Sequence, residues 1–244
     1  MSNFAYMSGT GNNFLVGEYE GDVSEIQIIA LVSDAEYDVD GVIFIEPIDT
    51  NSVKMYYYNN DGSDAELCVN GVRCVAKYSM DNNYLEVNRF IVKAPVGDLE
   101  VFVDDDMVEV STPIPTFEDA KININNFEGV KSTVGNPHFM IKVDDVDGFD
   151  LEKLNSEVLN QNIFSDGVNL EIYQIINRNY IKARVYERGV GETDACGSGA
   201  LCMFNYLNKT DQIDNKSFVM YPGGDLFLRF ENDNLYLSGE VIYL

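Results

Sequence analysis

The sequence has few basic residues, and this scarcity limits the partners that the protein can bind. Only 16 lysines and arginines stand against 41 aspartates and glutamates, which gives a net charge of −25 at pH 7. A surface of this sign repels nucleic-acid phosphates and anionic lipids, so we expect neither as a partner. The acidic residues form no run long enough to be an acidic tail, and we interpret them as a solvated surface.

Long apolar runs are missing as well. No stretch approaches the roughly 18 uninterrupted apolar residues that indicate a membrane-spanning helix. The first residues, Met1–Ala5, carry neither a basic region nor a long apolar run, so we expect no signal peptide. The four cysteines are therefore expected to be reduced thiols in a cytoplasmic protein.

Cysteine is scarce, and all four cysteines lie in two copies of one motif. The copies are Cys68-Val-Asn-Gly-Val-Arg-Cys74 and Cys196-Gly-Ser-Gly-Ala-Leu-Cys202, and both read C-x-[N/S]-G-x-x-C. They lie 128 residues apart (196 − 68), just over half of the 244-residue chain. A repeat at half the chain length predicts two similar domains, each with one copy.

The motif does not have the spacing of the common metal and redox sites. Structural zinc sites usually place cysteines two to four residues apart, and redox pairs read C-x-x-C, whereas five residues separate each pair here. Six positions along a helix correspond to about 240° of rotation, so Cys74 and Cys202 should point away from the first cysteines, into the core. Coincidental buried cysteines would explain the count but not the repeated glycines. We predict no metal site, and a metal or redox module stays as an alternative.

The stretch from Tyr186 to Cys202 predicts a strand, a glycine-rich turn and a helix that begins near Cys196. Backbone N–H groups are unpaired at a helix N-terminus, and the helix dipole favours negative charge there. A cysteine at that position tends toward its reactive thiolate. We expect the N–H groups of Gly197, Ser198 and Gly199 to form a cradle for a carboxylate.

Hydrophobic periodicity outlines a β-rich chain with four helices. Ser24 is a plausible N-cap of the first helix. Strands are predicted at residues 3–7, 14–19, 41–46, 52–58, 90–93, 99–103, 107–111, 139–143, 167–176, 180–186, 218–221, 226–230 and 235–243, and helices at 24–32, 70–81, 151–159 and 196–207. A polar turn is expected over residues 8–13, with Asn12 as a turn residue.

The segment Thr112-Pro-Ile-Pro-Thr116 resembles a linker, because two prolines in five residues favour an extended connector. We place the domain boundary there. The first domain is predicted to span residues 1–113 with Cys68, and the second to span residues 114–244 with Cys196. We leave open that the last strand packs on the first domain.

His138, the only histidine, lies in an Asn-Pro turn before a strand. A lone histidine beside an apolar run is more often structural than catalytic, but the turn favours a role in a site.

Six ordered motifs give the chain a resemblance to the diaminopimelate epimerases. They are Met7-Ser-Gly-Thr-Gly-Asn-Asn-Phe14, Asn59-Asn-Asp-Gly-Ser63, Cys68–Cys74, Gly135-Asn-Pro-His138, Gly167-Val-Asn169 and Glu187-Arg-Gly-Val-Gly-Glu-Thr-Asp-Ala-Cys-Gly-Ser-Gly199. The resemblance implies an α+β fold of two similar domains, each a small barrel-like, mostly antiparallel sheet around a central helix. It also implies an active site in the cleft between the domains, a homodimer, and no cofactor.

The resemblance further implies the reaction and its residues. The enzymes of this family interconvert LL- and meso-2,6-diaminopimelate, a small-molecule substrate on the way to lysine and peptidoglycan. Cys68 and Cys196 are the expected acid and base on the two faces of the α-carbon, supported by His138 and Glu187. The residues expected to bind substrate are Asn12, Asn59, Val69, Asn70, Asn136, Asn169, Glu187, Arg188, Gly197 and Ser198. The family has glycine where Val69 stands, and valine keeps the backbone N–H group.

Two other functions remain as alternatives at this point. One is a related two-thiol racemase or epimerase for another amino acid. The other is a non-catalytic relative that binds an amino acid in the same cleft without using the thiols. From the residues alone, Glu187 and Arg188 also read as an exposed ion pair at the end of a strand.

Overall fold

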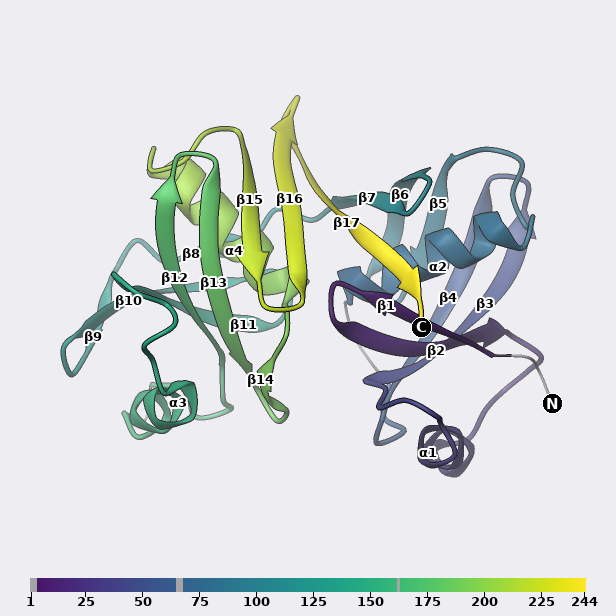
Figure 1. Cartoon of the computed structure of the whole chain (residues 1–244), viewed down its shortest axis with the longest axis horizontal. Helices are drawn as coiled ribbons and strands as arrows, with labels where there is room; N and C mark the ends of the chain where they lie inside the picture. Colours follow the sequence, from purple (N-terminus) through teal and green to yellow (C-terminus); the bar gives the residue numbers. More distant parts are fainter. Residues whose placement is uncertain (1–3, 65–67, 162) are drawn as a thin grey trace. The chain divides into compact units, whose positions relative to one another are not determined.

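The computed structural model describes residues 4–64, 68–161 and 163–244, and the chain separates into two compact units (Figure 1). Unit 1 comprises Met1–Thr112 and Ser238–Leu244, and unit 2 comprises Pro113–Leu237. The chain passes from unit 1 to unit 2 inside the proline-rich segment, where it forms no helix or strand at 113–115.

Unit 1 is a closed barrel of eight strands. Seven strands pair in sequence order, and the end of β17 pairs with both β7 and β1, which closes the ring. The strands are β1 (Ala5–Gly9), β2 (Asn12–Glu18), β3 (Gly41–Asp49), β4 (Ser52–Asn59), β5 (Arg89–Ala94), β6 (Gly97–Asp104), β7 (Met107–Thr112) and β17 (Asn234–Tyr243). Closure leaves this sheet without an exposed edge.

The helix α2 (Val69–Asp81) fills the barrel of unit 1. It contacts every strand from β1 to β7, and its residues 69–79 are all buried. The shorter helix α1 (Glu25–Ser33) begins with the predicted cap, because Ser24 and Gln27 form a capping box. Ile28 of α1 packs with Leu15, Val42 and Phe44 on the outer face of the sheet (Figure 1).

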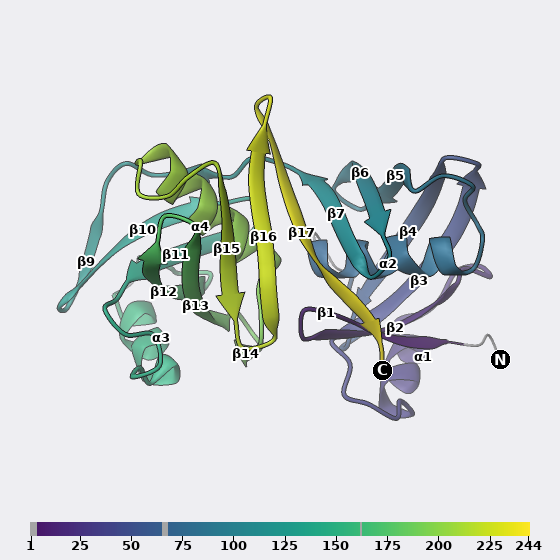
Figure 2. The same cartoon turned by 45° about the horizontal axis from the view of Figure 1, so that its top comes forward.

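Unit 2 repeats this architecture around α4 (Gly197–Lys209), with α3 (Leu151–Leu159) on the other face of its sheet. The strands are β8 (Thr116–Phe117), β9 (Ile122–Ile124), β10 (Phe127–Thr133), β11 (Pro137–Lys142), β12 (Asn169–Asn177), β13 (Tyr180–Glu187), β14 (Gly191–Thr193), β15 (Lys216–Tyr221) and β16 (Gly224–Glu231). The hairpin from β16 into β17 ends this unit (Figure 2).

The two units share one order of elements. In each, a hairpin is followed by an outer helix, a second hairpin, the central helix and a third hairpin. The sheet of each unit contains parallel pairs across a helix, as in β2 with β3 around α1 and β11 with β12 around α3. The predicted α+β fold of two similar domains, each a largely antiparallel barrel-like sheet around a helix, is confirmed.

Several predicted boundaries were wrong. The turn expected over residues 8–13 contains only Thr10 and Gly11, both at positive φ, because β1 and β2 form a tight hairpin. Asn12 therefore begins β2 instead of lying in the turn. Residue 3 of the first predicted strand lies outside the described residues.

The sequence pattern also missed β8, β9, β10 and β14. The strand β10 shows why, since two of its buried positions carry the glycine Gly129 and the polar Ser132 instead of large apolar side chains. An added Cβ at Gly129 would lie 2.3 Å from the ring of Phe139, so the core at this point is filled from the neighbouring strand. The alternation that marks a strand is absent as a result.

No helix in the described parts of the chain is both long enough and apolar enough to cross a membrane.

The contact between Gly129 and Phe139 gives a test of the unit 2 core. Gly129→Ala should lower the free energy of unfolding by about 1–3 kcal/mol, the usual cost of overpacking. The control is Gly148→Ala, where the nearest atom to the new Cβ would be a carboxylate oxygen of Asp145 at 3.3 Å. Denaturant unfolding should leave that control within about 0.5 kcal/mol of the wild type. Equal stabilities of the two variants would contradict the packing described.

Candidate active site

Both central helices begin at a cysteine, and the local geometry is the same. Cys68 is the N-cap of α2 with extended backbone (φ −124°, ψ 97°), and Cys196 is the N-cap of α4 (φ −133°, ψ 111°). Each Sγ accepts the backbone N–H of the residue three positions on, from Gly71 at 3.3 Å and from Gly199 at 3.4 Å. The thiols thus take the position that serine or aspartate usually occupies.

In unit 1, an amide network lies beside the start of α2. Asn70 is buried and donates from its side chain to Asn12 Oδ1. Asn12 in turn donates to Asp40 Oδ2 at 3.3 Å, and the same carboxylate oxygen accepts the backbone N–H of Asn13 at 2.9 Å. Two predicted substrate-binding residues, Asn12 and Asn70, are therefore brought together and held in a fixed orientation.

Arg73 anchors that network with a charge that is out of reach of water. Its side chain is fully buried, and its hydrogen bonds go to Asn70 Oδ1 (2.7 Å), Thr10 Oγ1 (2.9 Å) and the carbonyl of Glu240 (3.0 Å). All three acceptors are uncharged. Burial lowers the pKa of Arg73 to about 10, while its electrostatic interactions with Cys74 and Cys68 act in the opposite direction. Arg73 therefore remains a cation at neutral pH.

Two other predicted residues of unit 1 differ in their surroundings. Val69 is the first residue of α2 and is buried, so it has the negative φ of a helix and needs no glycine. Asn59, at the end of β4, donates to Ser63 Oγ at 2.9 Å and belongs to the following turn. Its hydrogen bond orders that turn and is separate from the Asn12–Asn70 pair.

In unit 2, Cys196 is surrounded by oxygen atoms. Its Sγ donates to Glu187 Oε2 at 3.4 Å and lies 3.4 Å from Ser198 Oγ, and the residue is only 4% exposed. Glu187, the last residue of β13, also accepts a hydrogen bond from Thr193 Oγ1 at 2.5 Å. Glu187 therefore lies against the thiol, as a partner of Cys196 must.

These carboxylates overturn one expectation from the sequence. The helix N-terminus was expected to favour the thiolate of Cys196, but the pKa of Cys196 is raised well above its ordinary value, first by burial and then by Glu187 and Glu171. The hydrogen bonds from Ser198 and Gly199 act in the opposite direction without prevailing. Cys196 is therefore a thiol at neutral pH. The Gly199 N–H is also engaged by Sγ, which leaves Gly197 and Ser198 as the cradle residues whose N–H groups have no partner among the described residues.

His138 stands at the centre of a second buried network. Its Nδ1 lies 2.6 Å from Glu171 Oε1, and its Nε2 lies 3.1 Å from Asn136 Oδ1. Asn136 donates through its amide nitrogen to Ser198 Oγ at 3.2 Å, which fixes its oxygen toward the imidazole. The network thus runs from β12 to the first turn of α4 and reaches the Cys196 partner Ser198.

Asn169 and Arg188 form a third group at the ends of β12 and β13. Asn169 Oδ1 accepts the backbone N–H of Arg188 at 2.8 Å, and its amide nitrogen donates to the carbonyl of Pro137 at 3.2 Å. The Arg188 guanidinium donates to the carbonyl of Asp166 at 3.2 Å, and the residue is exposed. The backbone carbonyl of Asp166 orients the Arg188 guanidinium, and its positive charge remains accessible to a ligand.

His138, Glu171 and Cys196 offer three donor atoms that all lie within 4.8 Å of one another, the kind of set that binds zinc. The pair His138 Nδ1 and Glu171 Oε1 is nevertheless separated by 2.6 Å. Two ligands of a tetrahedral zinc ion with bonds of about 2.0–2.1 Å would be about 3.3 Å apart. The observed separation is that of a hydrogen bond, so the geometry fits a shared proton better than a metal.

Sequence reasoning missed three polar residues of these networks, Asp40, Arg73 and Glu171, and it missed Tyr221, which interacts electrostatically with Cys196 and Glu171. The side chain of Tyr221 is buried, and its hydroxyl has no hydrogen-bond partner among the described residues. Burial is the main cause of the raised pKa of Tyr221. The only available signal was a charged residue, Glu171, at an inward position of an otherwise apolar strand.

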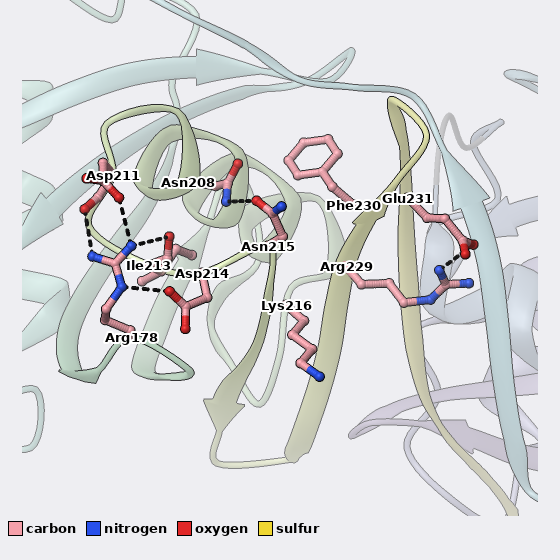
Figure 3. A pocket seen from close by; sticks show the side chains of 10 residues that line it. All are labelled: Arg178, Asn208, Asp211, Ile213, Asp214, Asn215, Lys216, Arg229, Phe230 and Glu231. Atoms are coloured by element: carbon pink, nitrogen blue, oxygen red, sulfur yellow. Dashed lines mark hydrogen bonds and ion pairs between the residues drawn. The ribbon is translucent and has the colours of Figure 1, made fainter.

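A separate hollow of about 550 Å³ lies at the other end of α4 (Figure 3). Its lining includes Arg178, Lys216 and Arg229 together with Asp211, Asp214 and Glu231. Arg178 is paired with Asp211 and Asp214, and Arg229 with Glu231. Charges of both signs thus balance, and the hollow contains none of the predicted site residues.

Comparison with known proteins identifies a family for the whole chain. The family model for diaminopimelate epimerase matches residues 4–117 and 130–244. A diaminopimelate epimerase from Brachyspira hyodysenteriae is 35% identical over 99% of this chain and 96% of its own length. One from Thermotoga maritima is 35% identical over 96% of each chain.

Solved structures with the same fold are more distant in sequence. A phenazine biosynthesis protein of the PhzF family from Enterococcus faecalis has a TM-score of 0.76 at 14% identity, covering 100% of this chain and 97% of its own. A hydroxyproline epimerase from Agrobacterium vitis has a TM-score of 0.70 at 12% identity, covering 99% and 88%. At these identities the likeness shows the fold alone.

The charge around Cys196 predicts how the thiol reacts. Glu187→Gln removes the nearest carboxylate, which lowers the pKa of Cys196, so alkylation of Cys196 by iodoacetamide at pH 8 should become roughly three- to tenfold faster. Peptide mass spectrometry reports the rate at each cysteine. The control is Glu192→Gln, since Glu192 is exposed and pairs with Arg184. Unchanged or slower alkylation in the Glu187 variant would contradict the electrostatic account.

Proposed function

The chain belongs to the diaminopimelate epimerase family, and on that premise we propose that it interconverts LL- and meso-2,6-diaminopimelate without a cofactor. The observation that carries the proposal is the pair of cysteine-capped central helices, one in each unit, with the same thiol-to-amide hydrogen bond. Relatives that bear this name match almost the full length of the chain.

The reaction requires two groups that exchange one proton each with the α-carbon. A thiolate removes the α-proton from one face, which breaks the C–H bond and leaves the electron pair on the substrate. A thiol then donates its proton to the opposite face and forms the new C–H bond. Each sulfur ends in the protonation state from which the other began, so the enzyme is set for the reverse direction. General acid–base catalysis of this kind contributes about 10²–10⁴-fold.

The electrostatics of each unit favour a division of these roles in the free enzyme. Cys196 is the acid, because burial and the two carboxylates raise its pKa and keep its proton. Cys68 is the base, supported by the buried cation Arg73, which interacts with it electrostatically. An unpaired buried cation favours a nearby anion such as a thiolate.

The carbanion formed in this way needs stabilisation at the substrate α-carboxylate. The first-turn N–H groups of Val69 and Asn70 in α2 and of Gly197 and Ser198 in α4 are suited to that role, because helix N-termini bind anions. Arg188, which is exposed, is suited to hold the distal carboxylate in a bidentate contact. The amides of Asn12, Asn59, Asn136 and Asn169 are proposed to bind the remaining polar groups of the substrate.

The family resemblance also supports a homodimer and a cytoplasmic location as parts of this proposal. The thiol pair supplies both proton transfers, so no cofactor enters the chemistry.

The test is an assay of LL-diaminopimelate conversion with cysteine variants. Cys68→Ala and Cys196→Ala should each reduce kcat by at least about 10²-fold, because each removes one of the two proton-transfer groups. Chiral chromatography of the two isomers measures the rate. Cys202→Ala is the matched control, since Cys202 lies in the same helix as Cys196 but is fully buried.

The outcomes separate the alternatives. Loss of activity in both first-cysteine variants with activity retained in the control supports the proposal. Turnover of proline or 4-hydroxyproline, with none of diaminopimelate, would replace it by a racemase for another amino acid. Normal diaminopimelate turnover in either first-cysteine variant would remove the two-thiol mechanism.

A further inference from the structure

Glu171 is a carboxylate at a core position of β12. Its neighbours Leu170 and Ile172 point to one face of the sheet, into the hydrophobic cluster that packs on α3. Because successive strand residues alternate in direction, Glu171 points to the other face, toward α4. Its side chain is 0% exposed. A buried carboxylate is costly unless something compensates for its charge or its proton.

The carboxylate of Glu171 lies directly against the first turn of α4. A Cβ added at Gly199 would lie 2.5 Å from Glu171 Oε1 and 3.1 Å from its carboxyl carbon. Gly199 is also the residue whose N–H is donated to Cys196 Sγ. Glycine at this position therefore lets one carboxylate approach the turn that holds the thiol, at the end of the helix where negative charge is favoured.

The hydrogen bonds around His138 indicate how many protons the His138–Glu171 pair carries. Asn136 presents its oxygen to Nε2, so Nε2 carries a proton. Nδ1 and Glu171 Oε1 are 2.6 Å apart and share another proton. The pair is electrically neutral whether that shared proton lies on Nδ1, giving imidazolium and carboxylate, or on Oε1, giving imidazole and carboxylic acid.

We propose that Glu171 is a positioning residue that acts through His138: it holds the imidazole by this shared proton and keeps a neutral, two-proton pair beside Cys196. The role deepens the proposed function and, where it concerns turnover, rests on it. When Cys196 gives its proton to the substrate and becomes a thiolate, the shared proton moves from Oε1 to Nδ1. The pair then presents imidazolium near the new negative charge without gaining or losing a proton.

The surroundings agree with a pair that can adjust in this way. The titratable groups that face Glu171 are His138 from β11, Glu187 from β13, Tyr221 from β15, and Cys196 and Cys202 from α4. Burial raises the pKa of Glu171, and Glu187 adds to the effect, whereas His138 lowers it. Glu171 Oε2 has no partner among the described residues, so the hydrogen bond to His138 is the main anchor of the carboxyl group.

The chain offers an unusually direct test, because His138 is its only histidine. Protein labelled with ¹⁵N-histidine gives one pair of ring-nitrogen signals that need no assignment by mutation. The wild type should show one proton bonded to Nε2 and a second, strongly deshielded proton shared between Nδ1 and Glu171 Oε1. A wild-type spectrum with an unprotonated Nε2, or without a proton shared at Nδ1, would overturn the proposal without any variant.

The substitution Glu171→Gln removes the ionisable carboxyl group and preserves the shape of the side chain. The glutamine amide can donate to Nδ1 but cannot share a proton with it, so the ring should carry a single proton on Nε2. The shared-proton signal should disappear, and kcat for diaminopimelate should fall by about 10- to 100-fold with KM unchanged. The matched control is Tyr173→Phe, two residues along the same face of β12 and also buried. It should leave the histidine spectrum and kcat as in the wild type.

The two readouts separate the possible failures. An unchanged histidine spectrum in Glu171→Gln would refute the positioning role even if activity were lost. The predicted spectral change with no diaminopimelate turnover in the wild type would instead refute the proposed function and leave the shared proton in place. A fall in kcat matched by Tyr173→Phe would assign the effect to general loss of packing.

Discussion

The structure depends on a sulfur atom that caps a helix. In each unit the thiol at the start of the central helix accepts the N–H of the third helical residue, at 3.3 Å for Cys68 and 3.4 Å for Cys196. Oxygen is the usual acceptor in this position, and sulfur is a weaker one. The cap nevertheless places an ionisable sulfur at the point where a helix presents unpaired N–H groups. The rest of each barrel fixes the helix that carries it.

Identical caps have different electrostatic surroundings. In unit 1 the buried cation Arg73, which is bonded to neutral oxygens, interacts electrostatically with Cys68. In unit 2 the thiol faces Glu187 directly and Glu171 through a buried pair. This difference supports the proposal that Cys68 is the base and Cys196 the acid. The proposed epimerisation needs one thiolate and one thiol at a time, because two thiolates or two thiols could not complete a proton exchange.

The sequence was sufficient to predict the two-domain fold and to identify the repeated cysteine motif. The helices were predictable because their caps and apolar periods are local, as at Ser24 and in α3, and the repeat of the cysteine motif indicated two domains. The strand β10 was not predictable, since Gly129 is small only because Phe139 from the adjacent strand fills its space. Such long-range packing leaves no local pattern.

The protonation state of Cys196 was mispredicted for a related reason. Sequence shows the helix N-terminus, whose effect is about 0.3–1 kcal/mol, but not the burial, which can shift a pKa by 3–5 units at about 1.4 kcal/mol each. Burial outweighs the helix N-terminus and, together with Glu171 and Glu187, keeps the proton on Cys196. Glu171 itself was hidden because a glutamate in a strand ordinarily faces water, and only the fold turns it inward toward Gly199.

The central claim is that two different sulfurs handle the proton that leaves and the proton that arrives. The initial rate of LL-diaminopimelate conversion in D₂O, with mass analysis of both isomers, tests it most directly. The account predicts one deuterium at the inverted α-carbon of each meso product, while the recovered LL isomer stays free of deuterium at low conversion. Deuterium entering the recovered substrate as fast as the product, or product that keeps its original proton, would contradict it.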